Sequence, residues 1–131
     1  MKVVYFSVTG QTKRFAAKLN AYETIEIDPT AELEMKEPYV LVVPTYEAEF
    51  IAPVFDFLET GENQKFLAGV SGSGNRNFAE LFVFSAKEIA KKYGVPLIYA
   101  FEFSGMKEDV DNFEEEVREL ERKTTMVRAQ Q

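Results

Sequence analysis

The sequence predicts one α/β domain, a doubly wound sheet of five parallel strands with helices on both faces. Apolar, strand-like runs alternate with amphipathic, helix-like segments, which is the pattern of a parallel sheet connected by helices. Residues 39–43 form an unbroken apolar run, as expected of a central strand buried on both faces. The length of 131 residues allows one core, which we assign to residues 1–123, followed by a flexible tail over 124–131.

The first half of the chain supplies three strands and one helix. Residues 2–6 are mostly apolar and form the first strand, and residues 12–20 carry apolar side chains at helical spacing. Residues 22–28 alternate polar with apolar side chains, as an outer strand does. The central strand at 39–43 follows.

The second half supplies the other elements. Residues 53–60 form a short helix, and residues 66–70 form the fourth strand. Residues 77–93 form a long helix that ends at a glycine with a proline just beyond. Residues 95–103 form the fifth strand, and residues 107–123 form a closing amphipathic helix.

The link between the second and third strands is short. The link, residues 29–38, is shorter than the dozen or more residues that a parallel crossover normally needs. We therefore expect the helix of this crossover to be missing or reduced to a turn. The alternative is an antiparallel second strand, which fits less well with right-handed crossovers in the rest of the chain.

The composition excludes several kinds of chemistry. The sequence has no Cys, His or Trp, so thiol redox couples, Cys/His zinc sites and histidine-based triads are impossible. Acidic residues are interpreted as solvated helix faces, and no catalytic side chain or metal ligand is assigned. The net charge of −7 argues against nucleic acid and suits solubility or a basic protein partner. Apolar runs are too short for a membrane span and the N-terminus does not resemble a signal peptide, so we expect a cytoplasmic protein.

A hydroxyl-rich loop follows the first strand and consists of Ser7, Val8, Thr9, Gly10, Gln11 and Thr12. Unpaired N–H groups at a helix start favour a bound phosphate, hydroxyls add donors, and glycine lets the main chain approach the anion. No Lys follows the glycine, so this is not the nucleoside-triphosphate P-loop. It resembles the loop with which flavodoxins hold the phosphate of FMN. The alternative is a capped turn, which is common in α/β proteins.

Two further loops with ligand-like composition follow the third and fourth strands. Ligands of open α/β sheets bind beyond the carboxyl ends of the strands. The loop at 44–50 offers Tyr46 and Phe50, whose rings could lie against a planar ligand. The loop at 71–78 is rich in glycine, so its main chain could pass along a flat ligand and donate N–H groups.

Each of these two loops also has an ordinary explanation. Tyr46 and Phe50 could be core or rim aromatics, and the glycine-rich loop could be a turn capped by Asn75 or Asn77. Three such loops at consecutive strand ends are harder to explain separately. A phosphate loop beside two planar-ligand loops predicts a mononucleotide site, for which FMN is the natural occupant.

Three segments make this hypothesis more specific: residues 73–78 (SGNRNF), 93–96 (YGVP) and 101–105 (FEFSG). With them, nearly the whole chain resembles the NrdI family, flavodoxin-like accessory proteins of class Ib ribonucleotide reductase. The resemblance implies the strand order 2-1-3-4-5 and an FMN flavoprotein that docks on the small, radical-bearing reductase subunit. It also implies that oxygen is reduced to superoxide or peroxide, which is delivered to assemble the tyrosyl-radical cofactor, commonly a dimanganese one. An unidentified reductase would supply the electrons.

The resemblance assigns roles residue by residue. Phosphate contacts fall to Ser7, Thr9, Gly10, Gln11 and Thr12, and ring contacts fall to Thr45, Tyr46, Gly74, Asn75 and Phe78. The full predicted cofactor site comprises Ser7, Val8, Thr9, Gly10, Gln11, Thr12, Pro44, Thr45, Tyr46, Glu47, Phe50, Gly72, Ser73, Gly74, Asn75 and Phe78. The sequence departs from the family at Glu47, Ala48 and Glu49, where members often carry glycines or small polar residues. Unless both point to water, two carboxylates there would disfavour an anionic reduced flavin.

Two other functions fit the same fold class. One is a general electron-carrier flavodoxin without oxygen chemistry. The other is a flavin-free scaffold or signalling domain, because a fold does not fix a function. A signalling receiver domain would need an acidic cluster at the ends of strands one and three, where this chain has hydroxyls and Tyr46. In both flavin-binding interpretations the flavin carries the chemistry, and side chains only position it.

Overall fold

The structure is a computed structural model that describes residues 1–129. Its single five-stranded sheet has the order β2-β1-β3-β4-β5, and every neighbouring pair is parallel. The predicted fold class and strand order are therefore confirmed. The strands are β1 (Lys2–Tyr5), β2 (Thr24–Glu26), β3 (Tyr39–Val43), β4 (Leu67–Gly74) and β5 (Leu97–Glu102).

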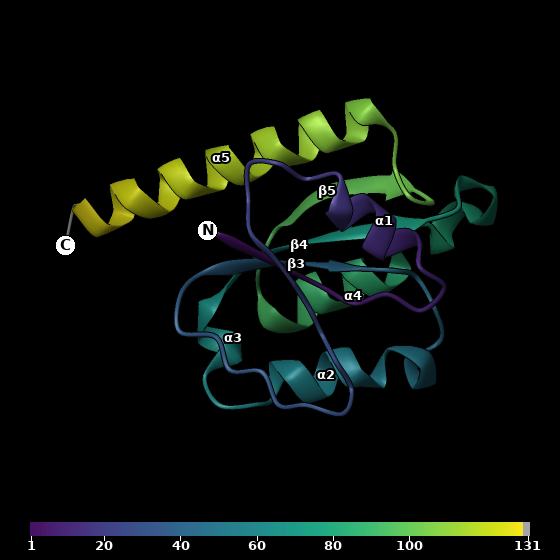
Figure 1. The fold of residues 1–131 in the computed structure, drawn as a ribbon, viewed down its shortest axis with the longest axis horizontal. Helices are drawn as coiled ribbons and strands as arrows, with labels where there is room; N and C mark the ends of the chain where they lie inside the picture. Colours follow the sequence, from purple (N-terminus) through teal and green to yellow (C-terminus); the bar gives the residue numbers. More distant parts are fainter. Residues whose placement is uncertain (130–131) are drawn as a thin grey trace.

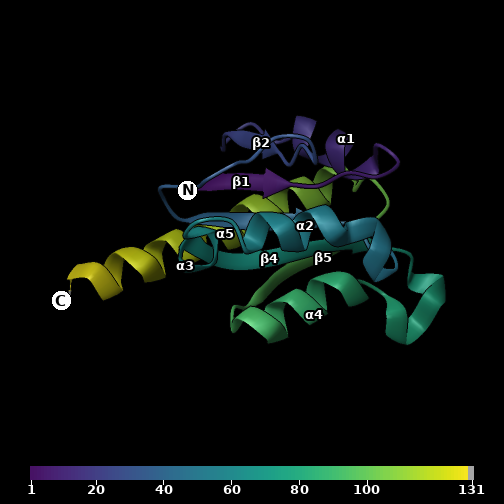
Figure 2. The same ribbon diagram turned by 90° about the horizontal axis from the view of Figure 1, so that it is seen from below.

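Helices cover both faces of the sheet (Figure 1). One face carries α1 (Gln11–Ala17) and α5 (Lys107–Ala129); the other carries α2 (Ala52–Leu58), α3 (Asn63–Phe66) and α4 (Phe84–Tyr93). Figure 2 shows β1 and β2 toward one edge of the sheet and β5 toward the other. Two short 3-10 helices, η1 (Ala48–Ile51) and η2 (Arg76–Leu81), follow β3 and β4.

Two hydrophobic cores fill the space between the sheet and its helical layers. Val4 and Leu41 belong to the core under α2 and α4, whereas Val3 and Val40 belong to the core under α1 and α5. Successive residues of a strand point to opposite faces, so the continuous apolar runs of β1 and β3 supply both cores.

The crossover between β2 and β3 has no helix, as predicted. β2 is parallel to β1, with Val3 paired to Thr24, which rules out the antiparallel alternative. The buried Asn63 side chain bonds to this link instead. Its Oδ1 accepts from the Met35 N–H at 2.7 Å, and its Nδ2 donates to the Leu33 carbonyl at 2.8 Å. One amide side chain thus satisfies main-chain groups that a helix would have paired.

The fourth strand is longer than predicted. β4 continues to Gly74, so residues 71–74, which were expected in a loop, belong to the strand. Gly72 pairs with Val43 in β3 and with Ala100 in β5. Pairing on both sides outweighs the low strand propensity of serine and glycine.

The predicted helix at 77–93 is divided into η2 and α4. The backbone leaves helical geometry at Ala79 and Val83, both at φ 49°. Positive φ is unfavourable for residues with a side chain, and most of all for a β-branched valine. The sequence contains no glycine or proline there, so the pattern gave no sign of this break.

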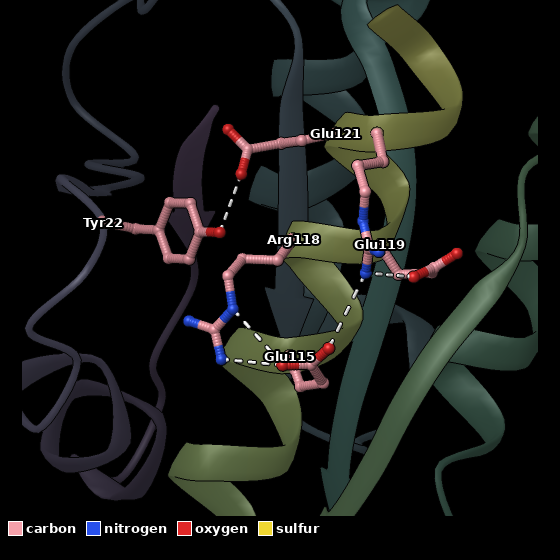
Figure 3. Close-up of polar contacts among 6 residues, drawn as sticks. Tyr22, Glu115, Arg118, Glu119 and Glu121 are labelled. Carbon is pink, nitrogen blue, oxygen red and sulfur yellow. Dashed lines mark hydrogen bonds and ion pairs between the residues drawn. The ribbon is translucent and has the colours of Figure 1, made fainter. Parts of the chain in front are cut away.

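The closing helix α5 continues past the predicted end at 123 to Ala129, because nothing in 124–129 is a glycine or proline that would end it. The predicted tail therefore begins as helix, and residues 130–131 lie outside the described residues. Figure 3 shows contacts along this helix: the Tyr22 hydroxyl donates to Glu121 at 2.8 Å, and Arg118 donates to Glu115. Over residues 1–129 we find no helix long and apolar enough to cross a membrane.

Candidate functional site

An open cavity of about 790 Å³ lies at the carboxyl ends of β1, β3 and β4. It contains every predicted site residue except Ser7, Gly10, Phe50 and Gly72. Five lining residues were not predicted: Ala48, Leu81, Phe84, Glu88 and Phe103. The complete lining is Val8, Thr9, Gln11, Thr12, Pro44, Thr45, Tyr46, Glu47, Ala48, Ser73, Gly74, Asn75, Phe78, Leu81, Phe84, Glu88 and Phe103.

The first loop is shaped by Ser7. Its hydroxyl oxygen accepts from the Gly10 N–H at 3.1 Å and from the Lys13 N–H at 3.3 Å. Gly10 has φ 95°, a left-handed conformation that glycine adopts without strain. Ser7 and Gly10 therefore determine the loop conformation rather than line the cavity.

Thr12 is the buried residue of this loop. It is 1 % exposed, and its Oγ1 has no hydrogen-bond partner among the described residues. The main-chain N–H groups of Gln11 and Thr12 also precede the first intrahelical donor of α1, the Arg14 N–H, which donates to the Gly10 carbonyl at 3.0 Å. A buried hydroxyl without a partner costs about 1–3 kcal/mol. A bound anion at this end of the cavity would remove that cost, so the residues present fit a phosphate group.

The second loop is fixed to two neighbouring segments. The Thr45 hydroxyl donates to the Ser73 carbonyl at 2.7 Å, and the Tyr46 hydroxyl donates to Thr9 Oγ1 at 3.3 Å. Tyr46 is half-buried and lines the cavity, whereas Phe50 is 53 % exposed, with its ring centroid 6.3 Å from that of Tyr46. Tyr46 is thus a wall residue, and Phe50 belongs to the surface beside it.

The glycines of β4 serve close packing. A Cβ at Gly72 would lie 2.6 Å from the Ala86 Cβ, and one at Gly74 would lie 3.0 Å from the Val83 main-chain nitrogen. Gly72 therefore faces α4 rather than the cavity. Only glycine, which has no Cβ, allows α4 to lie so close to β4. Asn75 accepts from the Asn77 N–H at 2.9 Å, so of the two predicted caps it is Asn75 that caps η2.

Large apolar side chains surround the cavity mouth. We call this set the apolar rim. Exposed apolar groups gathered around a cavity are typical of interaction sites. Sequence patterns missed three of them, since Leu81 and Phe84 fall within the predicted helix and Phe103 within the predicted fifth strand. The rim comprises Val8, Phe78, Leu81, Phe84 and Phe103, which line the cavity, and Phe50, which lies beside Tyr46.

Charges at the mouth are mostly acidic. Arg76 is paired with Glu102 at 2.9 Å, and hydrogen bonds from the Arg76 main chain and guanidinium lower the pKa of Glu102. Glu47 and Glu88 line the cavity without forming an ion pair with any side chain that the structure describes. These two carboxylates give the cavity wall a negative potential.

An open sheet of order 2-1-3-4-5 with a cavity at the β1/β3 switch point defines a flavodoxin-like protein. The fold resembles two solved structures. A short-chain flavodoxin associated with a non-canonical PDU bacterial microcompartment has a TM-score of 0.62 at 20 % identity, covering 93 % of this chain and 96 % of that one. A Streptococcus pneumonia TIGR4 flavodoxin has a TM-score of 0.59 at 23 % identity, covering 93 % and 97 %.

Sequence comparison places the chain within one family of this fold. Residues 3–115 match the family model described as NrdI flavodoxin-like. "Protein NrdI" of Bartonella tribocorum is 46 % identical over 116 residues, which is 82 % of this chain and 86 % of that protein. "Protein NrdI" of Brucella ovis is 38 % identical over 117 residues, covering 84 % and 87 %. The chain belongs to the NrdI flavodoxin-like family.

Proposed function

We propose that the protein binds FMN non-covalently and activates the small subunit of a class Ib ribonucleotide reductase. The buried Thr12 hydroxyl, for which the described residues provide no hydrogen-bond partner, lies in the cavity lining and carries the FMN part of this proposal. Membership of the NrdI flavodoxin-like family supports a flavoprotein associated with ribonucleotide reductase. The sequence-based expectation of a cytoplasmic location is part of the same proposal.

Three segments would hold the cofactor. Residues 7–12 would bind the phosphate through main-chain N–H groups and hydroxyls. Tyr46 and Phe78 supply aromatic side chains to the cavity lining from two different segments, and Ser73 and Asn75 are polar residues of the same lining. A cavity with one anion-binding end and aromatic walls suits a molecule with a phosphate and a flat ring system.

Bound FMN would supply the electron transfer that reduces oxygen to superoxide or peroxide for the radical cofactor of the partner. The side chains bind and orient the flavin, exclude water and set the local potential. The carboxylates of Glu47 and Glu88 oppose additional negative charge in the cavity. No side chain is required as a nucleophile or general base.

The apolar rim supports docking of the small subunit over the cavity mouth. An oxidant produced in the cavity must reach its target without loss to bulk water, so the mouth has to be covered by the partner. The net charge of −7 favours a partner with a basic rim. An unidentified reductase would supply the electrons.

The test combines a cofactor assay with a binding assay. The purified protein should show a flavin absorption spectrum or acquire one with added FMN. After reduction it should react rapidly with oxygen and bind a class Ib small subunit. Slow reaction with oxygen and no subunit binding would favour a general electron carrier. A protein that takes up no FMN would favour a flavin-free scaffold and refute the proposal.

A further inference from the structure

One side chain from a distant segment holds the main chain of Tyr46. The Ser85 hydroxyl, on the first turn of α4, accepts from the Tyr46 N–H at 3.2 Å and donates to the Tyr46 carbonyl at 3.1 Å. A serine hydroxyl has one donor and two acceptor lone pairs, so it can serve both groups at once. Ser85 is 1 % exposed and does not line the cavity.

Close packing of α4 makes this contact possible. The missing Cβ of Gly72 leaves room for Ala86, the neighbour of Ser85, against β4. Val83, at φ 49°, turns the chain into α4, whose second residue is Ser85. The first turn of α4 therefore lies within hydrogen-bond distance of the loop after β3.

Tyr46 extends the connection across the cavity wall. Its hydroxyl donates to Thr9 Oγ1 at 3.3 Å, in the loop that would hold the phosphate. The tyrosine ring between these two contacts lines the cavity. Tyr46 is thus held at both ends, at its main chain by Ser85 and at its hydroxyl by Thr9.

We propose that Ser85 is a positioning residue for the flavin site, because its hydroxyl fixes the Tyr46 main chain and thereby the Tyr46 ring against the flavin. The inference rests on the proposed FMN site, and Ser85 itself touches no ligand. Without this hydroxyl, the Tyr46 N–H and carbonyl lose their partner and the loop samples other conformations.

The first experiment measures amide hydrogen exchange by NMR in the FMN-free protein. In Ser85→Ala the Tyr46 amide should exchange about tenfold faster, which corresponds to about 1.4 kcal/mol for the lost contact. The matched control is Ser71→Ala. Ser71 is fully buried and donates one hydrogen bond to the Tyr99 carbonyl at 2.7 Å, but it does not line the cavity. This control should leave the Tyr46 amide unchanged.

The second experiment measures the fluorescence of bound FMN. An electron-rich ring in contact with a flavin quenches its fluorescence, so Ser85→Ala should raise the emission and Ser71→Ala should not. In a Tyr46→Leu background, Ser85→Ala should cause no further rise. If Ser85→Ala does not fold, Ser85→Cys, which retains a weaker donor and acceptor, should change both signals in the same direction.

Two results would overturn the inference. One is an unchanged Tyr46 amide exchange rate in the Ser85 variant. The other is an equal rise of fluorescence in the wild-type and Tyr46→Leu backgrounds, which would mean that Ser85 acts elsewhere. Failure of the wild-type protein to bind FMN would refute the proposed function and, with it, a flavin-positioning role for Ser85.

Discussion

Thr12→Val is expected to change stability and ligand affinity in opposite directions. Valine has nearly the shape of threonine but lacks the hydroxyl, which is buried without a hydrogen-bond partner in the described part of the chain. Removing such a group relieves a penalty of about 1–3 kcal/mol. The FMN-free variant should therefore be more stable than the wild type by about 1 kcal/mol.

The affinity for FMN should fall in the same variant. A hydroxyl that donates to a phosphate dianion makes a charge-assisted hydrogen bond worth about 1.5–3 kcal/mol. Its loss corresponds to about ten- to 150-fold weaker binding. Riboflavin lacks the phosphate, so its affinity should not change.

Urea denaturation of the FMN-free protein measures the first effect, and titration of flavin fluorescence measures the second. Thr24→Val is the control, because Thr24 is half-buried on β2 and does not line the cavity. Equal losses of affinity for FMN and riboflavin would refute the assignment of Thr12 to the phosphate. So would a loss of stability in the FMN-free variant with unchanged FMN binding.

Three further changes probe the wall, the rim and the opposite end of the fold. Glu47→Gln should raise the reduction potential at which the anionic reduced flavin forms by about 30 mV, as measured by spectroelectrochemistry. This shift corresponds to about 0.7 kcal/mol of relieved repulsion. Glu49→Gln should have less effect, because Glu49 does not line the cavity. Phe50→Ala should weaken small-subunit binding by about 1 kcal/mol or more in calorimetry, whereas Glu115→Lys on α5 should not. Burial and a hydrogen bond to Glu59 raise the pKa of Tyr93 to about 12, so its contribution to stability is full below about pH 10 and is lost as the pH rises through about 12. When stability is measured by urea denaturation over this pH range, the free energy of unfolding should decline less in Tyr93→Phe than in the wild type.

Each of these expectations has a contrary outcome. An unchanged potential for Glu47→Gln at low salt would mean that this carboxylate is solvated and electrically remote. Loss of binding in Glu115→Lys but not in Phe50→Ala would place docking on the α5 face and exclude direct delivery of an oxidant. An equal alkaline decline in Tyr93→Phe and the wild type would assign that decline to other groups.

Hydrophobic patterning was sufficient to predict the sheet but not the shape of its carboxyl edge. The unbroken apolar run of β3 predicted a central strand, because a strand that is buried on both faces has apolar side chains at every position. Ser71 and Gly74 suggested a loop because their local preferences oppose a strand, and only the flanking β3 and β5 reverse that preference.

The unpredicted part of the cavity depends on backbone conformations that sequence patterns do not report. Val83 and Phe103 both have positive φ without being glycine, so no turn signal marks them. Phe84 follows the break at Val83, and Phe103 directly follows β5; both line the cavity. The hydroxyl-rich loop was easier to predict, because a strand, a glycine and a helix start lie next to one another in the sequence.

The missing helix between β2 and β3 has a consequence for the order of folding. Asn63, which bonds to the Met35 N–H and the Leu33 carbonyl, lies in α3, on the far side of β3 and α2 in the sequence. The link therefore has no local route to its native conformation and must wait until the α2–α3 turn is in place. Residues 29–38 should behave as a late-ordering segment, whose non-local contacts form only after the folding nucleus.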